Sequence, residues 1–128
     1  MNGVTRRIIL VDDNDLVRGV LRAMLDQGGF HVSEAHDGAR ALRALNAGPF
    51  DAILTDLVMP DCDGIELLRK VRRSFPTIRV LAMSGASAAP LYLQAARALG
   101  ASGVLAKPID QDVLLAAVNG LFDNTPAS

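Results

Sequence analysis

Acidic, hydroxyl and ammonium side chains stand directly after short apolar runs of this 128-residue sequence. They are Asp12, Asp13, Asp56, Ser84 and Lys107. Two bare carboxylates about 4 Å apart repel each other by roughly 4 kcal/mol at an effective dielectric near 20. Three carboxylates in one place would therefore need a cation, or some would protonate. Because the ligands would be oxygens alone, the pattern favours Mg²⁺, which often takes one or two carboxylates and keeps several waters.

A carboxylate beside a divalent cation stays ionised and can act as a nucleophile towards phosphorus. An acyl phosphate on Asp56 would carry three oxygens close to the cation, the Lys107 ammonium and the Ser84 hydroxyl. Phosphoryl transfer depends mainly on such positioning and charge neutralisation. Asp56 could instead be a helix cap, but Leu-Val-Met-Pro after it is a poor helix start. We therefore interpret Asp56 as the nucleophile.

Five apolar runs and five helical patterns must position these side chains. The runs occupy residues 8–11, 32–35, 52–55, 80–83 and 104–106. Between and after them, helical spacing predicts helices near 15–27, 39–47, 65–74, 91–99 and 111–121. Asn14 or Asp15 is expected to cap the first helix, Gly28-Gly29 to end it, and Asp110 to cap the last. Alternating strands and helices with short connections indicate a parallel α/β fold. In such a sheet a ligand crevice lies outside the carboxyl ends of the strands, so the three carboxylates meet if the first and third strands are neighbours.

Composition limits the class of protein. The length suits one domain, half of the residues are hydrophobic and the net charge is −1, so binding to nucleic acid is not indicated. The single Cys62 excludes an internal disulfide, and no apolar run is long enough for a membrane helix or signal peptide. We expect a cytoplasmic protein. Zinc is a poor candidate, because His31, His36 and Cys62 have no ligand spacing.

Four motifs occur in a fixed order: ILVDDN, ILTDLVMPDCDGIELL, VLAMSGA and VLAKP. In this combination the chain resembles a bacterial response-regulator receiver domain, from residue 8 to about 122. The resemblance implies a doubly wound five-stranded parallel sheet of order 2-1-3-4-5 with five helices on both faces. It also implies one receiver domain over 1–128, with a core at about 6–122 and a flexible tail at 123–128.

By this resemblance, Asp56 is the phosphoacceptor and takes its phosphoryl group from a sensor histidine kinase or a phosphotransfer protein. Asp12 and Asp13 match the acid pair that holds Mg²⁺, with Asp56 and the backbone carbonyl of Val58 as further ligands. Ser84 matches the switch hydroxyl.

Lys107 matches the lysine that pairs with the phosphate, and Pro108 a proline after a peptide bond that is usually cis in this family. Pro60 and Gly64, with Met59, are interpreted as structural residues that steer the loop beside the site. Val104 stands where many receivers have Tyr or Phe. Coupling is therefore expected to run through Ser84 and the following loop rather than through an aromatic ring.

Two further departures concern hydrolysis. In fast-hydrolysing relatives, polar side chains two residues after the phosphoacceptor and the switch hydroxyl can orient the attacking water. Val58 and Ala86 occupy these places and cannot form such hydrogen bonds. We predict a long-lived phosphoryl group.

The surface suggests where partners bind. The helices at 91–99 and 111–121 are apolar over more than one face, which is typical either of a wide core contact or of a partner or homodimer face made with the fifth strand. Leu16 and Arg18 on the first helix point away from its predicted core stripe and are candidates for kinase docking.

Two other functions share parts of this pattern. A Mg²⁺-dependent phosphatase with an aspartyl-phosphate intermediate usually has a second acid where Val58 stands. A flavodoxin-like module for a nucleotide or flavin would have a Gly-rich loop after the first strand, where DDND stands instead. We therefore expect a signalling module that catalyses only its own phosphorylation and slow dephosphorylation, and that controls a partner or output domain.

Overall fold

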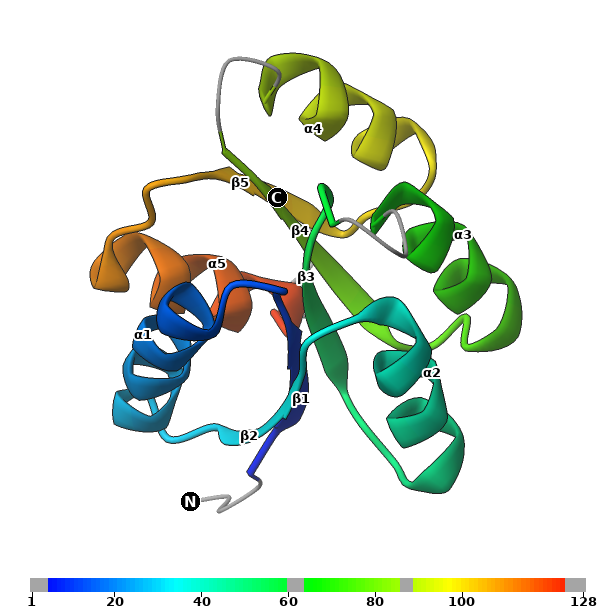
Figure 1. The fold of residues 1–128 in the computed structure, drawn as a ribbon. Helices are drawn as coiled ribbons and strands as arrows, with labels where there is room; N and C mark the ends of the chain where they lie inside the picture. Colours follow the sequence, from blue (N-terminus) through cyan, green and yellow to red (C-terminus); the bar gives the residue numbers. More distant parts are fainter. Residues whose placement is uncertain (1–4, 60–63, 86–88, 124–128) are drawn as a thin grey trace.

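The computed structural model describes residues 5–59, 64–85 and 89–123, in which strands and helices alternate (Figure 1). The strands are β1 (Arg7–Val11), β2 (His31–Ala35), β3 (Ala52–Asp56), β4 (Arg79–Ser84) and β5 (Gly103–Ala106). The helices are α1 (Asp15–Gln27), α2 (Gly38–Ala47), α3 (Gly64–Ser74), α4 (Ala89–Ala98) and α5 (Gln111–Leu121). All strand pairs are parallel and their order is β2-β1-β3-β4-β5, which confirms the expected fold.

β1 lies between β2 and β3. Val11, its last residue, pairs with Ala35 of β2 on one side and with Thr55 of β3 on the other. The carboxyl ends of β1 and β3 therefore lie side by side, as the meeting of the three carboxylates requires.

Helices cover both faces of the sheet. Figure 1 shows α1 and α5 on one face and α2, α3 and α4 on the other. Alternate residues of β1 enter the two cores: Leu10 packs in the core that includes Leu21 and Leu114, and Ile9 in the core that includes Leu67. Because both faces are covered, β1, β3 and β4 are almost continuously buried, as their unbroken apolar runs predict. β5, at the sheet edge, is more exposed.

Local signals fix the helix ends. The Asn14 side chain accepts a hydrogen bond from the backbone N–H of Val17 at 3.0 Å and caps α1. Asp37 does the same for α2 through the N–H of Arg40 at 2.8 Å. Asp110 stands at the N-cap of α5, but its side chain makes no capping hydrogen bond. The turn after α1 uses a positive φ of 87° at Gly29, which glycine adopts without strain.

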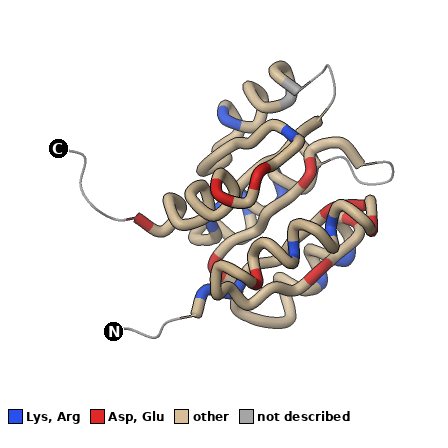
Figure 2. The backbone as a smooth tube through the Cα atoms, turned by 90° about the vertical axis from the view of Figure 1, so that its left-hand side faces the viewer, with Lys and Arg blue, Asp and Glu red and all other residues tan. Residues whose placement is uncertain are grey.

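Figure 2 shows basic and acidic positions interspersed over the face in view. Among the described helices, none has the length and apolar character required to cross a membrane.

Candidate functional site

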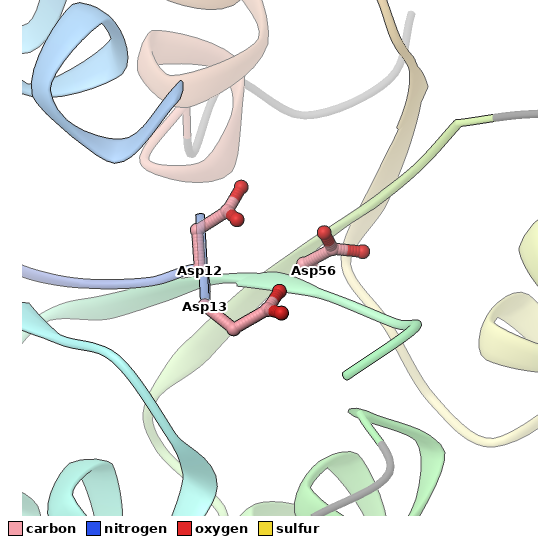
Figure 3. Close-up of side chains that lie close together, drawn as sticks. All are labelled: Asp12, Asp13 and Asp56. Atoms are coloured by element: carbon pink, nitrogen blue, oxygen red, sulfur yellow. The ribbon is translucent and has the colours of Figure 1, made fainter. Parts of the chain in front are cut away.

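Three carboxylates meet at the carboxyl edge of the sheet. Asp12 and Asp13 follow β1, Asp56 ends β3, and one oxygen from each lies within 4.8 Å of the others (Figure 3). Asp12 is fully buried and Asp56 nearly so, whereas Asp13 is exposed to solvent. The cluster therefore has two fixed inner acids and one outer acid at its opening.

Lys107 bridges the two inner acids. Its Nζ donates to Oδ2 of Asp12 at 2.9 Å and to Oδ2 of Asp56 at 2.8 Å. Burial lowers the pKa of Lys107, but the hydrogen bonds to Asp56 and Asp12 outweigh burial and hold this pKa above the usual lysine value. The ammonium therefore stays charged at neutral pH and neutralises part of the cluster.

The remaining oxygens of the inner acids are held by the backbone. Oδ1 of Asp12 accepts from the N–H of Asn14, and Oδ1 of Asp56 from the N–H of Val58, both at 3.0 Å. Each inner carboxylate is thus fixed from two directions, one of which is Lys107. This fixed geometry is what a preorganised reaction site requires.

The donor set fits Mg²⁺. The cluster offers three carboxylates, and one ammonium is hydrogen-bonded to two of them, so the site can accept further positive charge. The outer position of Asp13 leaves one side of the cluster open to solvent, so a cation held there would keep access to water.

Ser84 and Val104 lie on the β4 and β5 side. Ser84 is fully buried, and its Oγ donates a long hydrogen bond of 3.4 Å to the carbonyl of Gly85. The N–H of Lys107 donates to the carbonyl of Ser84 at 2.8 Å, which joins the two strand ends. Val104 is partly buried in the core beneath α4.

The loop residues are described in part. A Cβ added at Gly64 would lie 2.3 Å from the carbonyl oxygen of Asp56, so the start of α3 approaches the end of β3 more closely than any side chain permits. Met59 is buried, and the peptide bond between Lys107 and Pro108 is cis, as the resemblance implied. Pro60, Cys62 and Ala86 lie outside the described residues.

The two docking candidates on α1 have different environments. Leu16 is 78% exposed, in agreement with the expectation. The Arg18 side chain is only 15% exposed and contacts Glu34, Asp15 and the carbonyl of Asp12, so it is less accessible to a partner than its position on the helix suggested. Sequence reasoning missed Glu34 as well. The available signal was the four-residue spacing of Arg18 and Arg22, which puts two cations on one face of α1.

A groove opens beside the cluster. It has a volume of about 520 Å³ and is lined mainly by apolar residues of α1 and of the segment after β5. The lining residues are Leu16, Val17, Val20, Leu21, Met24, Gly85, Lys107, Pro108 and Ile109.

Comparison with known proteins agrees with this geometry. The family model described as the response regulator receiver domain matches residues 8–119. The chain is 40% identical to the response regulator receiver protein CpdR of Brucella abortus over 67% of this chain and 72% of that protein. It is 34% identical to the CAI-1 autoinducer sensor kinase/phosphatase CqsS of Vibrio cholerae over 86% of this chain but only 16% of that protein.

Solved structures are similar too. The chemotaxis response regulator CheY4 of Vibrio cholerae superposes with a TM-score of 0.84 at 28% identity, covering 93% of this chain and all of that chain. The chain thus spans the whole of that chemotaxis regulator structure but only 16% of the CqsS sensor kinase.

Proposed function

Since the chain belongs to the response regulator receiver domain family, we propose that Asp56 accepts a phosphoryl group in a Mg²⁺-dependent reaction. The observation that carries the proposal is the cluster of Asp12, Asp13 and Asp56 within 4.8 Å, with Lys107 hydrogen-bonded to Asp56 at 2.8 Å. Asp12, Asp13, Asp56 and the Val58 carbonyl would hold the cation, which supplies charge neutralisation for the transferred group.

Three residues of the site have defined parts in the proposed transfer. A carboxylate oxygen of Asp56 attacks phosphorus, and the phosphorus–nitrogen bond of the donor phosphohistidine breaks as its electron pair returns to the imidazole. The backbone N–H of Val58 keeps the Asp56 carboxylate oriented during the attack. Lys107 exchanges its hydrogen bond to Asp56 for one to a phosphoryl oxygen.

Ser84 and Lys107 would convert phosphorylation into a conformational signal. The hydroxyl of Ser84 gives up its weak bond to the Gly85 carbonyl and donates to the phosphoryl group, so the phosphate stabilises the rearranged state more than the resting one. Val104 lacks a ring that could report this change, so the segment after β4 would carry it. The chain would act as a signalling module that phosphorylates itself and turns over no other substrate.

The test is phosphorylation of the purified chain by a small-molecule phosphodonor in Mg²⁺, followed by intact mass. Asp56→Asn should gain no phosphoryl group. Asp26→Asn is the control, because this acid of α1 is half-exposed and lies outside the cluster; it should react as the wild type does.

Normal incorporation by Asp56→Asn would contradict the proposal. Multiple turnover of a phosphomonoester would favour the aspartyl-phosphate phosphatase, and a bound yellow cofactor the flavodoxin-like module.

For the donor partner, we propose that a sensor histidine kinase or phosphotransfer protein docks on the groove beside α1. The groove is apolar, includes the exposed Leu16 and reaches Lys107, so a partner seated there would bring its phosphohistidine to the cluster. Leu16→Asp should slow transfer from the kinase and leave phosphorylation by a small donor intact. Equal loss of both reactions would refute the docking site.

A second property concerns the lifetime of the phosphoryl group. The Val58 side chain is half-exposed and cannot hydrogen-bond a water. Val58→Asn should therefore shorten the lifetime by about tenfold, which corresponds to a barrier about 1.4 kcal/mol lower. Val113→Asn is the matched control, because Val113 of α5 is exposed to the same degree as Val58 and does not line the groove beside the cluster. Loss of most of the wild-type label within seconds, without partners, would contradict slow hydrolysis.

For the output, we propose the face formed by α4, β5 and α5 as the surface for a downstream protein or a second copy of the chain. Leu91 of α4 and Val113 of α5 are 71% and 51% exposed, and β5 is only partly buried.

A further inference from the structure

The guanidinium of Arg18 reaches the backbone beneath the carboxylate cluster. Its Nη1 donates to the carbonyl oxygen of Asp12 at 2.8 Å, and its Nε donates to Oε1 of Glu34 at 2.8 Å. Its Nη2 lies 2.8 Å from Oδ1 of Asp15. All three nitrogens of a largely buried side chain are therefore committed to fixed partners in three directions.

The carbonyl that Arg18 holds belongs to the peptide joining Asp12 to Asp13. The Asp12 side chain is fixed separately by the N–H of Asn14 and by Lys107. The backbone N–H of Asp12 donates to the carbonyl of Ala35 at 3.2 Å. Asp13 is exposed, and no side-chain hydrogen bond or ion pair of Asp13 is found within the described residues. The orientation of the peptide before Asp13 is therefore the main constraint on where this outer carboxylate points.

Glu34 anchors Arg18 to the neighbouring strand. One carboxylate oxygen of Glu34 accepts from Arg18 and the other from Nη1 of Arg22, each at 2.8 Å. Hydrogen bonds from Arg22 and Arg18 hold the pKa of Glu34 below its usual value, so the acid is ionised at neutral pH. A charged link thus runs from β2 through α1 to the end of β1.

We propose that Arg18, anchored by Glu34, is a positioning residue for the cation site. By fixing the Asp12–Asp13 peptide, it keeps the Asp13 carboxylate within reach of Asp12 and Asp56. The inference rests on the proposed function in one respect, namely that this cluster binds Mg²⁺. Arg18 itself touches neither the cation nor the phosphoryl group.

Charge and position predict opposite effects of removing Arg18. Loss of a positive charge near an acidic cluster strengthens its attraction for a cation. Loss of a fixed peptide orientation weakens binding, as happens when groups that orient metal ligands are removed. The sign of the change in Mg²⁺ affinity therefore separates positioning from simple electrostatics.

The experiment is a Mg²⁺ titration of the phosphoryl-free chain, followed by backbone amide chemical shifts. Arg18→Gln should bind Mg²⁺ about tenfold more weakly than the wild type. Arg18→Lys keeps the charge but lacks the three-direction geometry of a guanidinium, and should also bind more weakly. Arg22→Gln is the matched control: it removes the same charge and a contact to the same Glu34, but no bond to Asp12, and should stay within about twofold of the wild type.

A second variant tests the anchor and leaves Arg18 in place. Glu34→Gln should weaken Mg²⁺ binding by about threefold, because the guanidinium loses one of its fixed partners. Denaturation curves measured without Mg²⁺ show which variants are folded. If the Arg18 variants are unfolded, Glu34→Gln tests the positioning role in their place.

The outcomes distinguish the two proposals. A wild-type chain that fails to bind Mg²⁺ would refute the cation site and with it the proposed function. If the wild-type chain binds Mg²⁺ and the Arg18 and Glu34 variants bind it equally well or more tightly, only the positioning role is refuted.

Discussion

The two sides of the carboxylate site are held with different firmness. On the β1 and β3 side, Asp12 and Asp56 are each fixed by Lys107 and by a backbone N–H at 2.8–3.0 Å. On the β4 and β5 side, the bond that the Ser84 hydroxyl makes within the described residues is a 3.4 Å bond to a carbonyl, and β5 is partly exposed. Binding and chemistry need preorganisation, whereas a switch needs groups that can change partners at low cost. Under the proposed function, the half that reacts is the firmly held one and the half that responds is the more loosely held one.

The largest effect is expected from removing the ammonium that unites the fixed side. Lys107→Met should lower the free energy of unfolding by about 2–3 kcal/mol without Mg²⁺, because the buried Asp12 carboxylate loses the ammonium that pairs with it. The folded-state pKa of Lys107 is raised, so its contribution is complete below the unfolded pKa and is lost as pH rises through the folded one. Chemical denaturation at neutral pH, where the contribution of Lys107 is complete, measures the loss of unfolding free energy.

Lys70→Met is the control for that measurement, since Lys70 is an exposed residue of α3. Saturating Mg²⁺ should restore part of the stability of Lys107→Met by binding the folded state. If the two lysine variants were equally stable without Mg²⁺, the fixed side would not depend on Lys107.

A slightly smaller effect is expected where α3 meets the end of β3. Gly64→Ala places a Cβ 2.3 Å from the Asp56 carbonyl oxygen and 2.4 Å from Cα of Leu57, so the backbone must shift. We expect a loss of about 2 kcal/mol in thermal unfolding, within the range for overpacking. Gly19→Ala is the control, because nothing lies within 4 Å of its Cβ position in α1.

A third prediction concerns the pH dependence of the fixed side. The folded pKa of Glu34 is lowered by Arg22 and Arg18, so its stabilisation is present above the unfolded pKa and is lost as pH falls through the folded one. Glu34→Gln should lower the unfolding free energy by about 1 kcal/mol at pH 7. Its difference from the wild type should shrink in acid, and a constant difference across the titration would exclude the ionic contribution.

The smallest effect on stability is expected on the more loosely held side. Leu91→Asp changes an exposed residue of α4 and should alter the unfolding free energy by less than about 0.5 kcal/mol. If α4, β5 and α5 form the output face, the phosphorylated Leu91→Asp chain should neither dimerise nor bind its partner, as measured by analytical ultracentrifugation. A large loss of stability would show that Leu91 belongs to the core instead.

Much of the fold was readable from local patterns. Unbroken apolar runs predicted the buried strands, and Asn14 and Gly28 marked the ends of α1 because caps act within a few residues. The meeting of Asp12 and Asp56 needed the strand order in addition, which the motifs implied and the structure confirms.

The role of Arg18 could not be predicted in the same way. Its position on the helix pointed away from the core stripe, which is equally true of a docking residue and of one that reaches sideways to β2. The spacing of Arg18 and Arg22 puts two cations on one face of α1, but it does not show that Glu34 lies opposite them, because that contact is long-range. The same limit applies to Asp110, whose residue type and position suited a side-chain cap that the structure lacks.

The groove beside α1 has a consequence for chemical intervention. Its apolar walls end at Lys107 and Pro108, whereas the acids that would hold the cation do not line it. If a protein donor docks there as proposed, a compound that fills the groove would block transfer from that donor and leave reaction with small phosphodonors intact. Such a compound would separate the two routes of phosphorylation.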